Sequence, residues 1–207
     1  MNKIILLIGD SGSGKDYFLD IINEYDSVEV VKKYISRAAR TSEKNSISSI
    51  FNTSIDEIKK LDYFYEGVEK GNWYAICSSD LDRVLNSGKS PIVVCPNYEN
   101  YLQMLNDYNG QVVPFFIYRG YSDDEIEKWR SSLIARGSSL HEIEEREKKR
   151  DFYFKNLYLE HYELGENVIL NLYDITTKED LRLQFEGLCQ KNGIDIEFLE
   201  KSKNKLI

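Results

Sequence analysis

The sequence predicts an α/β fold in which helices cover both faces of a doubly wound parallel sheet. Short, continuous apolar runs such as residues 3–9 (KIILLIG) and 91–96 (PIVVCP) are typical of strands that are buried on both faces. Segments with the apolar spacing and capping residues of helices separate these runs. The alternation of buried strands with helices is the pattern of a parallel sheet built from strand–helix–strand units.

The first elements are a strand at residues 3–9, which ends at a glycine, and a helix at residues 15–25 (KDYFLDIINEY). The helix is expected because the apolar residues of this segment cluster at helical spacing. Residues 28–36 (VEVVKKYIS) are predicted to form a single second strand.

Two short helices are expected next, and each has a serine near its start. Ser54 precedes Glu57 by three residues, which is the pattern of a capping box. Either Ser78 or Ser79 is expected to cap the second helix, and Gly88 is expected to end it.

The second half of the chain continues the alternation. Further strands are expected at residues 91–96, 111–120 and 167–174, and further helices at 122–137, 138–163 and 177–193. Pro114 lies inside one of these strands and favours a position near the sheet edge, because proline cannot donate a backbone hydrogen bond. Thr176 or Thr177 is expected to cap the last helix.

Length and charge limit the class of protein. A chain of 207 residues with 42% hydrophobic residues is long enough to bury its own core and fits one domain. Its net charge of -8 argues against general nucleic-acid binding, which needs a positive surface. A small anionic ligand needs only a local cluster of cations, which an acidic protein can still supply.

Cysteine and histidine usage argues against a structural metal site. Cys77, Cys95, Cys189, His141 and His161 show no zinc-ligand spacing, and scattered thiols are typical of a reducing compartment. No apolar run approaches the roughly 20 residues that cross a bilayer, and the N-terminus leads directly into a strand. We therefore expect a cytoplasmic protein, monomer or homodimer, with neither nucleic acid nor membrane as its partner.

Residues 9–16 (GDSGSGKD) nearly match the phosphate-binding P-loop pattern of Gly, four residues, Gly, Lys, and Ser or Thr. The match lies between a predicted strand and a predicted helix, as the motif requires, so its backbone N–H groups can converge on a phosphate. The sequence therefore predicts a P-loop NTPase-type sheet. The expected nucleotide-binding residues are Gly9, Asp10, Ser11, Gly12, Ser13, Gly14, Lys15 and Asp16.

Asp16 stands where the pattern has a hydroxyl group that binds Mg²⁺. A carboxylate is also a hard oxygen ligand, so Asp16 could hold the metal directly or through water. In the opposite interpretation its negative charge repels ATP, an effect that Lys15 and the metal would offset. The sequence leaves both interpretations open.

Four further segments resemble parts of guanylate kinases. Residues 36–43 (SRAARTSE) resemble the family's S-x-T-T-R-x-P-R-x-G-E segment, and residues 69–94 resemble its H-G-N-Y-Y-G-T-S…L…G-K-x-V-I-L stretch. Residues 135–150 resemble the family's lid, R-G-x-x-x…I-x-x-R, and residues 167–174 its late V-I-V-N-D strand end. The segments keep the family's order and spacing from residue 3 to about 190. The chain thus resembles a guanylate-kinase-like P-loop kinase.

This resemblance implies a small acceptor-binding subdomain at about residues 35–79 and a helical lid at about 123–155. The core would be formed by residues 1–34 and 80–190, and residues 191–207 would be a C-terminal tail.

The resemblance also implies phosphoryl transfer from ATP, with Mg²⁺, to a small-molecule phosphate acceptor, which requires cations around both phosphates. Lys15 would contact the donor phosphates, and Arg136 and Arg146 would reach the transferred group when the lid closes. Asn171 would lie beside the adenine. Arg130 and Arg150 are interpreted instead as solvated surface charges.

On the acceptor side, the resemblance implies that Arg37 and Arg40 clamp the acceptor phosphate and that Tyr74 contacts it or stacks on the base. The family's base-reading Glu falls on Tyr65, with Glu66 one residue on, so both become candidate substrate-binding residues.

Other positions depart from the family. A hydroxyl that reaches guanine is replaced by Ile76, and the family's strand-end carboxylates fall on Val94 and Pro96. We therefore expect weak selectivity for guanine, unless Glu66 or Glu69 turns inward, and Asp16 as a substitute for the lost carboxylates near Mg²⁺.

Two alternatives to a nucleoside monophosphate kinase remain. The GSGKD loop also resembles that of ribose 1,5-bisphosphate phosphokinases, guanylate-kinase relatives whose acceptor is a phosphorylated sugar without a base. That family's strand end reads V-V-N-G-S, however, where this chain reads VVCPN. The second alternative is a catalytically weak nucleotide-binding module, against which the retained cations argue.

Overall fold

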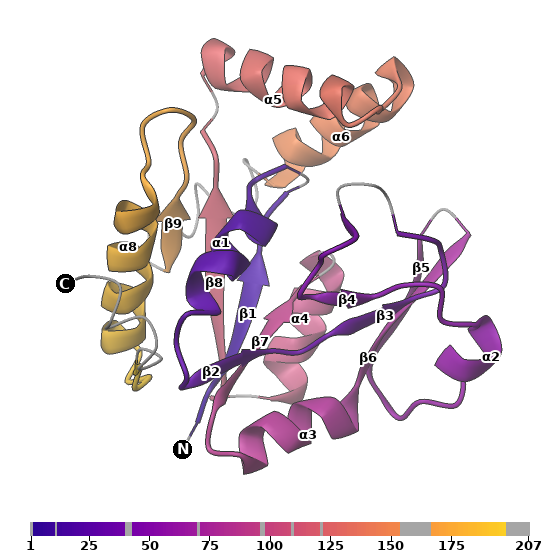
Figure 1. Cartoon of the computed structure of the whole chain (residues 1–207), viewed down its shortest axis with the longest axis vertical. Helices are drawn as coiled ribbons and strands as arrows, with labels where there is room; N and C mark the ends of the chain where they lie inside the picture. The colour runs from indigo at the N-terminus through magenta and orange to yellow at the C-terminus, as the bar shows by residue number, and fades with distance from the viewer. Residues whose placement is uncertain are drawn as a thin grey trace.

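A computed structural model describes residues 2–10, 12–39, 43–69, 71–95, 98–108, 110–120, 122–153 and 167–197. These residues form two sheets that lie side by side, with a pair of helices above the first sheet (Figure 1). No helix among them is long and apolar enough to span a membrane.

The first sheet has five strands, and every neighbouring pair is parallel. In spatial order the strands are β2 (Val28–Val30), β7 (Ser90–Val94), β1 (Ile4–Ile8), β8 (Val112–Tyr118) and β9 (Val168–Leu170). The predicted α/β fold with a doubly wound parallel sheet is thereby confirmed. The central strand β1 has all its residues buried, as its continuous apolar run predicts.

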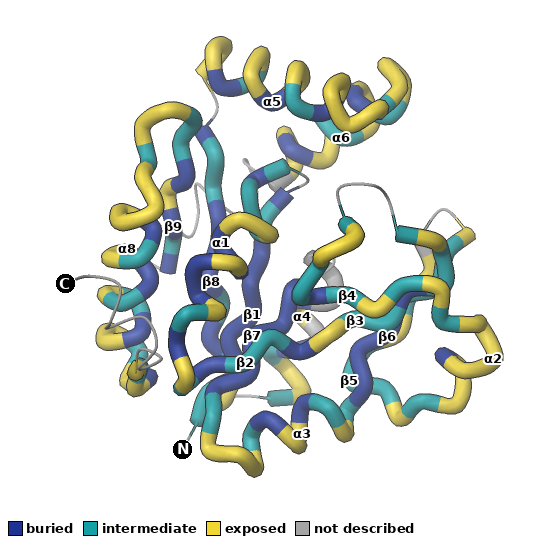
Figure 2. The backbone as a smooth tube through the Cα atoms, viewed as in Figure 1, coloured by how far each residue is buried: buried dark blue, intermediate teal, exposed yellow. Residues whose placement is uncertain are grey.

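Helices cover both faces of this sheet, as the layered core requires (Figure 1). Side chains of Ile5 and Leu7 pack with α1 (Lys15–Ile22) and α8 (Lys178–Lys191). Those of Ile4, Leu6 and Ile8 pack with α3 (Ser78–Asn86) and α4 (Tyr98–Asp107). In Figure 2 β1 and β7 are buried along their whole length.

Pro114 lies in an interior strand, because β8 is placed between β1 and β9. The pairing of β8 with β9 starts only at Phe116, whose N–H donates to the carbonyl oxygen of Asn167. Since alternate residues of a strand point their N–H groups to the same side, the missing N–H of Pro114 faces the side where β9 has not yet begun. The expectation of a position near the sheet edge agrees with the structure, because β8 is the neighbour of the edge strand β9.

The second sheet is mixed, and the sequence did not predict most of it. In spatial order its strands are β4 (Ser49–Ile50), β3 (Lys33–Ile35), β6 (Asn72–Cys77) and β5 (Tyr63–Glu69), with α2 (Ile55–Ile58) on one side.

The prediction of a single strand at residues 28–36 is wrong, because β2 belongs to the first sheet and β3 to the second. The change of sheet falls between Val31, which donates to Ile92, and Lys33, which donates to Ser48.

The capping predictions have mixed outcomes. Ser54 and Glu57 form the predicted capping box, and Thr177 caps α8 in a box with Asp180. A serine cap for α3 is wrong: Cys77 is the N-cap residue, and Ser78 is already helical.

Above the first sheet, α5 (Asp123–Ala135) and α6 (Leu140–Tyr153) form a helical hairpin (Figure 1). Trp129, Leu133 and Ile143 form a small apolar cluster between its arms. The carboxyl ends of β1 and β8 point toward this hairpin, so the usual ligand-binding edge of an open α/β sheet lies beneath it. The remainder of the helix predicted at 138–163 lies outside the described residues.

Phe185 of α8 makes edge-to-face contacts with Phe18, Tyr25 and Phe115 and is fully buried. We predict that Phe185→Ala lowers the free energy of unfolding by about 3–5 kcal/mol, because it leaves a cavity between α1, α8 and the sheet. Leu183→Ala, at an exposed position of the same helix, is the matched control and is expected to change it by less than about 1 kcal/mol. Denaturant unfolding measures both, and equal effects would contradict the packing described.

Candidate functional site

The glycine loop joins β1 to α1 in the geometry that a phosphate cradle requires. Gly12 and Gly14 have left-handed backbones, with φ of 85° and 90°. A Cβ atom at Gly12 would lie 2.6 Å from the Trp129 indole nitrogen, and one at Gly14 would collide with the Asn171 amide. Only glycine fits at these two positions.

The start of α1 leaves polar groups available at this loop. Its N-cap residue is Gly14, so no capping side chain accepts from the first N–H groups of the helix. Ser13 Oγ is buried and has no hydrogen-bond partner among the described residues. Free donors at the positive end of a helix are suited to an anion.

The side chain of Lys15 is held across the loop by backbone carbonyl oxygens of the loop. Its ammonium donates to the carbonyl oxygens of Gly9 and Asp10, at 2.8 Å each. Burial lowers the pKa of Lys15, and the carboxylates of Asp10 and Asp16 partly oppose this effect. An ammonium has three N–H donors, so one remains for a ligand.

Asp10 connects the loop to the helical hairpin. Its carboxylate lies 3.6 Å from Arg150 Nε of α6, and both side chains are less than a tenth exposed. Arg150 also donates to the carbonyl oxygen of Gly120 and lies 5.1 Å from the Trp129 ring centroid. The interpretation of Arg150 as a solvated surface charge is therefore wrong, whereas Arg130 lies at the surface in an ion pair with Glu147.

Burial raises the pKa of the Asp10 carboxyl, and the cations Lys15, Arg150 and Arg119 offset part of that rise. The loop thus contains a buried carboxylate whose charge depends on neighbouring cations.

Arg119 and Asn171, the residues that follow β8 and β9, hold the loop from the other side. The buried Asn171 donates from Nδ2 to the carbonyl oxygen of Ser13 at 2.8 Å. Arg119 donates to the carbonyl oxygen of Gly12 at 3.0 Å and lies 3.6 Å from the Tyr173 ring centroid. Sequence reasoning missed Arg119, although a cation directly after a buried parallel strand is a usable signal.

Strand register assigns the residues of the second sheet to its two faces. Lys33, Ile76 and Tyr65 are cross-strand partners, and Tyr74 lies two residues from Ile76 on the same face. Ile76 and Tyr65 pack into the core beside the first sheet, so this face is directed toward it. Glu66 pairs with Ala75 on the opposite face, where it is exposed.

Arg37 lies two residues after the end of β3 and is held in a fixed orientation. Its guanidinium donates to both oxygens of Glu43 at 2.7 Å and lies 5.1 Å from the Phe51 ring centroid. These hydrogen bonds, and one with Tyr74, raise the pKa of Arg37. The structure therefore brings Arg37 and Tyr74 together, whereas Glu66 is on the far face of the sheet.

Lys33 is a cation of this region that sequence reasoning missed, because it lies inside an apparently ordinary strand. Burial lowers its pKa to about 8, and repulsion from Lys15 and Arg37 adds to the shift. Attraction from Asp16 and Cys95 opposes it. The second sheet and the glycine loop therefore approach each other at Lys33.

The remaining candidates lie on the hairpin or outside the described residues. Arg136 is an exposed residue at the end of α5 whose charge contributes to lowering the pKa of Arg119, and Arg146 is half-buried in α6. Ser11 and Arg40 lie outside the described residues.

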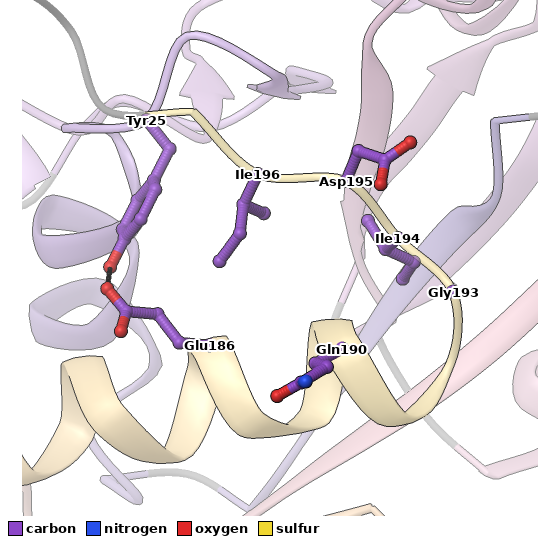
Figure 3. Close-up of a pocket in the computed structure, with 7 residues that line it drawn as sticks. All are labelled: Tyr25, Glu186, Gln190, Gly193, Ile194, Asp195 and Ile196. Carbon is purple, nitrogen blue, oxygen red and sulfur yellow. Dashed lines mark hydrogen bonds between the residues drawn. The ribbon is translucent and has the colours of Figure 1, made fainter.

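A separate hollow of about 450 Å³ lies at the carboxyl end of α1, away from the glycine loop (Figure 3). It is lined by Tyr25, Glu186, Gln190 and the segment from Gly193 to Ile196. The Tyr25 hydroxyl donates to Glu186 across it, and Asp195 adds a second carboxylate. Its acidic lining makes it a poor site for a phosphate ligand.

No family model matches the sequence, and no curated protein matches it. Among solved structures, the fold is similar to that of a guanylate kinase from Anaplasma phagocytophilum. The TM-score is 0.61 at 15% sequence identity, over 94% of this chain and 87% of the other. At that identity the similarity to a guanylate kinase establishes the fold, and a function needs the site residues in addition.

We predict that Lys33 is an unusually reactive amine in the folded protein. With a pKa of about 8, roughly half of its side chains are neutral at that pH, whereas an unfolded lysine titrates near pH 10.4. Brief acetylation with acetic anhydride between pH 7 and 10, followed by mass spectrometry, measures the midpoint. The same lysine in the urea-unfolded chain is the control, and identical midpoints in the two states would contradict the burial described.

Proposed function

We propose that the chain is a P-loop kinase that transfers a phosphoryl group from ATP, with Mg²⁺, to the phosphate of a nucleoside monophosphate. One observation carries the proposal: Lys33 lies within electrostatic range of two other cations. The first is Lys15, which is held across the glycine loop, and the second is Arg37, which follows β3 of the second sheet. Phosphoryl transfer depends on positioning two phosphates and neutralising the charge between them. Cations on the glycine loop and near β3 supply that requirement.

The donor side fits a nucleoside triphosphate. The uncapped start of α1 and the buried Ser13 hydroxyl would donate to the phosphates, and Lys15 would contact the outer ones. Asn171 and Arg119 hold the loop in shape through the carbonyl oxygens of Ser13 and Gly12.

On the acceptor side, Arg37 would bind the acceptor phosphate together with Arg40, and Tyr74 would orient Arg37 or contact the phosphate itself. Arg136 and Arg146 would reach the transferred group from the α5–α6 hairpin when it closes as a lid. Arg150 is not part of that set, because its ion pair with Asp10 anchors the base of the hairpin to the loop.

Asp16 fits a Mg²⁺ ion that is shared with the substrate. It is an exposed carboxylate in the first turn of α1, next to Lys15. The described residues contain no group of three or more acidic, histidine or cysteine side chains that could hold a metal ion alone. Mg²⁺ usually keeps several waters and binds one or two carboxylates plus substrate phosphates, so a single carboxylate is sufficient.

The face of the second sheet that bears Tyr74 offers little to a guanine base. Ile76 is buried on it and has no polar group, while Glu66 lies on the opposite face. Tyr65, on the same face, would be available to a base edge. This observation also favours the second candidate, a kinase whose acceptor is a phosphorylated sugar. A weak nucleotide-binding module is the third, and the assay below separates all three.

We predict ADP formation from ATP and Mg²⁺ with one member of a panel of ribo- and deoxynucleoside monophosphates and ribose 1,5-bisphosphate. Lys15→Ala is expected to lower kcat/KM by at least about 100-fold, because it removes the cation of the donor site. A coupled assay for ADP measures both proteins.

The acceptor that supports turnover identifies the substrate class. Strong preference for GMP would contradict the reasoning from Ile76 and Glu66. ATP binding without turnover on any acceptor would leave the binding module as the function.

For Asp16 we predict effects of opposite sign with and without metal. Asp16→Ala is expected to weaken ATP binding about tenfold in Mg²⁺ and to strengthen it slightly in EDTA, where a carboxylate only repels the phosphates. Asp16→Ser restores the hydroxyl of the usual pattern and is expected to bind MgATP nearly as the native protein does. Calorimetry measures all three, and unchanged binding of MgATP by Asp16→Ala would show that Asp16 is not a ligand.

A further inference from the structure

Lys33 is a half-buried cation whose ammonium forms no hydrogen bond or ion pair within the described part of the chain. Other lysines that are held in place do have partners: Lys3 donates to the carbonyl oxygen of Asn192, and Lys89 pairs with Asp26. Partial burial without a partner is unfavourable for a charge, and an anion that binds the ammonium would relieve this cost.

The position of Lys33 in the sheet is fixed by its register. It pairs with Ser49 on one side and with the buried Ile76 on the other, and shares their face. That face continues to Tyr74 and is directed toward the first sheet. An apolar residue at position 33 would extend the apolar core that contains Ile76, whereas a lysine at this position needs a polar partner.

The titratable groups that act on Lys33 belong to α1 and to the segments that follow β7 and β3. Lys15 and Asp16 belong to the start of α1, Cys95 follows β7, and Arg37 follows β3. Asp16 and Cys95 attract the ammonium, and Lys15 and Arg37 repel it. Lys33 thus lies within electrostatic range of both the donor cation and the acceptor cation.

We propose that Lys33 is a substrate-binding residue whose ammonium binds a phosphate oxygen of the acceptor, beside Arg37, next to the phosphoryl group that Lys15 holds. This inference rests on the proposed function. Because Glu43 occupies both ends of the Arg37 fork, the charge that neutralises the acceptor phosphate comes in large part from Lys33. A bound anion also relieves the repulsion among Lys15, Lys33 and Arg37.

The test compares Lys33→Met with Lys32→Met. Both variants lose one positive charge and keep an unbranched side chain that is one atom shorter, but Lys32 is exposed. Calorimetric titration with GMP, AMP and ribose 1,5-bisphosphate, each in the presence of a non-hydrolysable ATP analogue, gives the dissociation constants. Lys33→Met is expected to weaken the tightest of these by about 10- to 100-fold, as for the loss of a charged hydrogen bond. Binding of the ATP analogue alone is expected to change less than about threefold.

Lys33→Arg is the rescue variant, because it restores the charge; it is expected to recover most of the lost affinity. Thermal unfolding checks that Lys33→Met folds, and removal of an unpartnered charge is expected to leave its Tm unchanged or higher. Equal affinities of Lys33→Met and Lys32→Met, or no binding of any of the three compounds by the native protein, overturn the inference.

The two proposals fail in distinguishable ways. Turnover that depends on Lys15 but not on Lys33 leaves the kinase and removes Lys33 from its site. Acceptor binding that depends on Lys33, without ADP formation, keeps the anion site and removes the kinase.

Discussion

The anchoring of the glycine loop is the constraint on which the rest of the site depends. Four backbone carbonyls of this loop accept from Lys15, Arg119 and Asn171, which come from α1 and from the ends of β8 and β9. The Asp10–Arg150 ion pair adds the α5–α6 hairpin to the same loop. With its carbonyls held outward in this way, the loop can direct its N–H groups toward an anion. A protein of net charge -8 thereby gathers cations at one edge of its sheet.

Much of the fold could be predicted because it depends on local patterns. Continuous apolar runs identify the buried parallel strands, and the capping box at Ser54 and a threonine cap at 176 or 177 identify helix starts. The prediction failed where tertiary structure decides. Residues 28–36 read as one strand, but the chain changes sheets between Val31 and Lys33 without a turn signal. The strands β5 and β6 were missed because their polar and aromatic residues face partly solvated surfaces.

The candidate site divides in the same way. The glycines and Lys15 could be found because a cradle requires glycine at fixed spacing from the lysine. Charged residues could not be assigned from the sequence, because a helix pattern does not say which charge faces inward: Arg150 is buried although its neighbours on α6 are exposed. Lys33 and Arg119 lie at strand ends, and their part in the site follows only from the order and register of the strands.

The central claim is that the glycine loop binds the phosphates of a nucleotide, and amide chemical shifts test it most directly. In a titration of ¹⁵N-labelled protein with MgATP, the account predicts the largest shifts at Gly12, Gly14, Lys15 and Asp16, where the N–H groups are directed to the phosphates. The residues around the hollow in Figure 3, among them Gln190 and Gly193, are expected to stay unchanged. Shifts concentrated at that hollow, or none at the loop at millimolar ATP, would contradict the account.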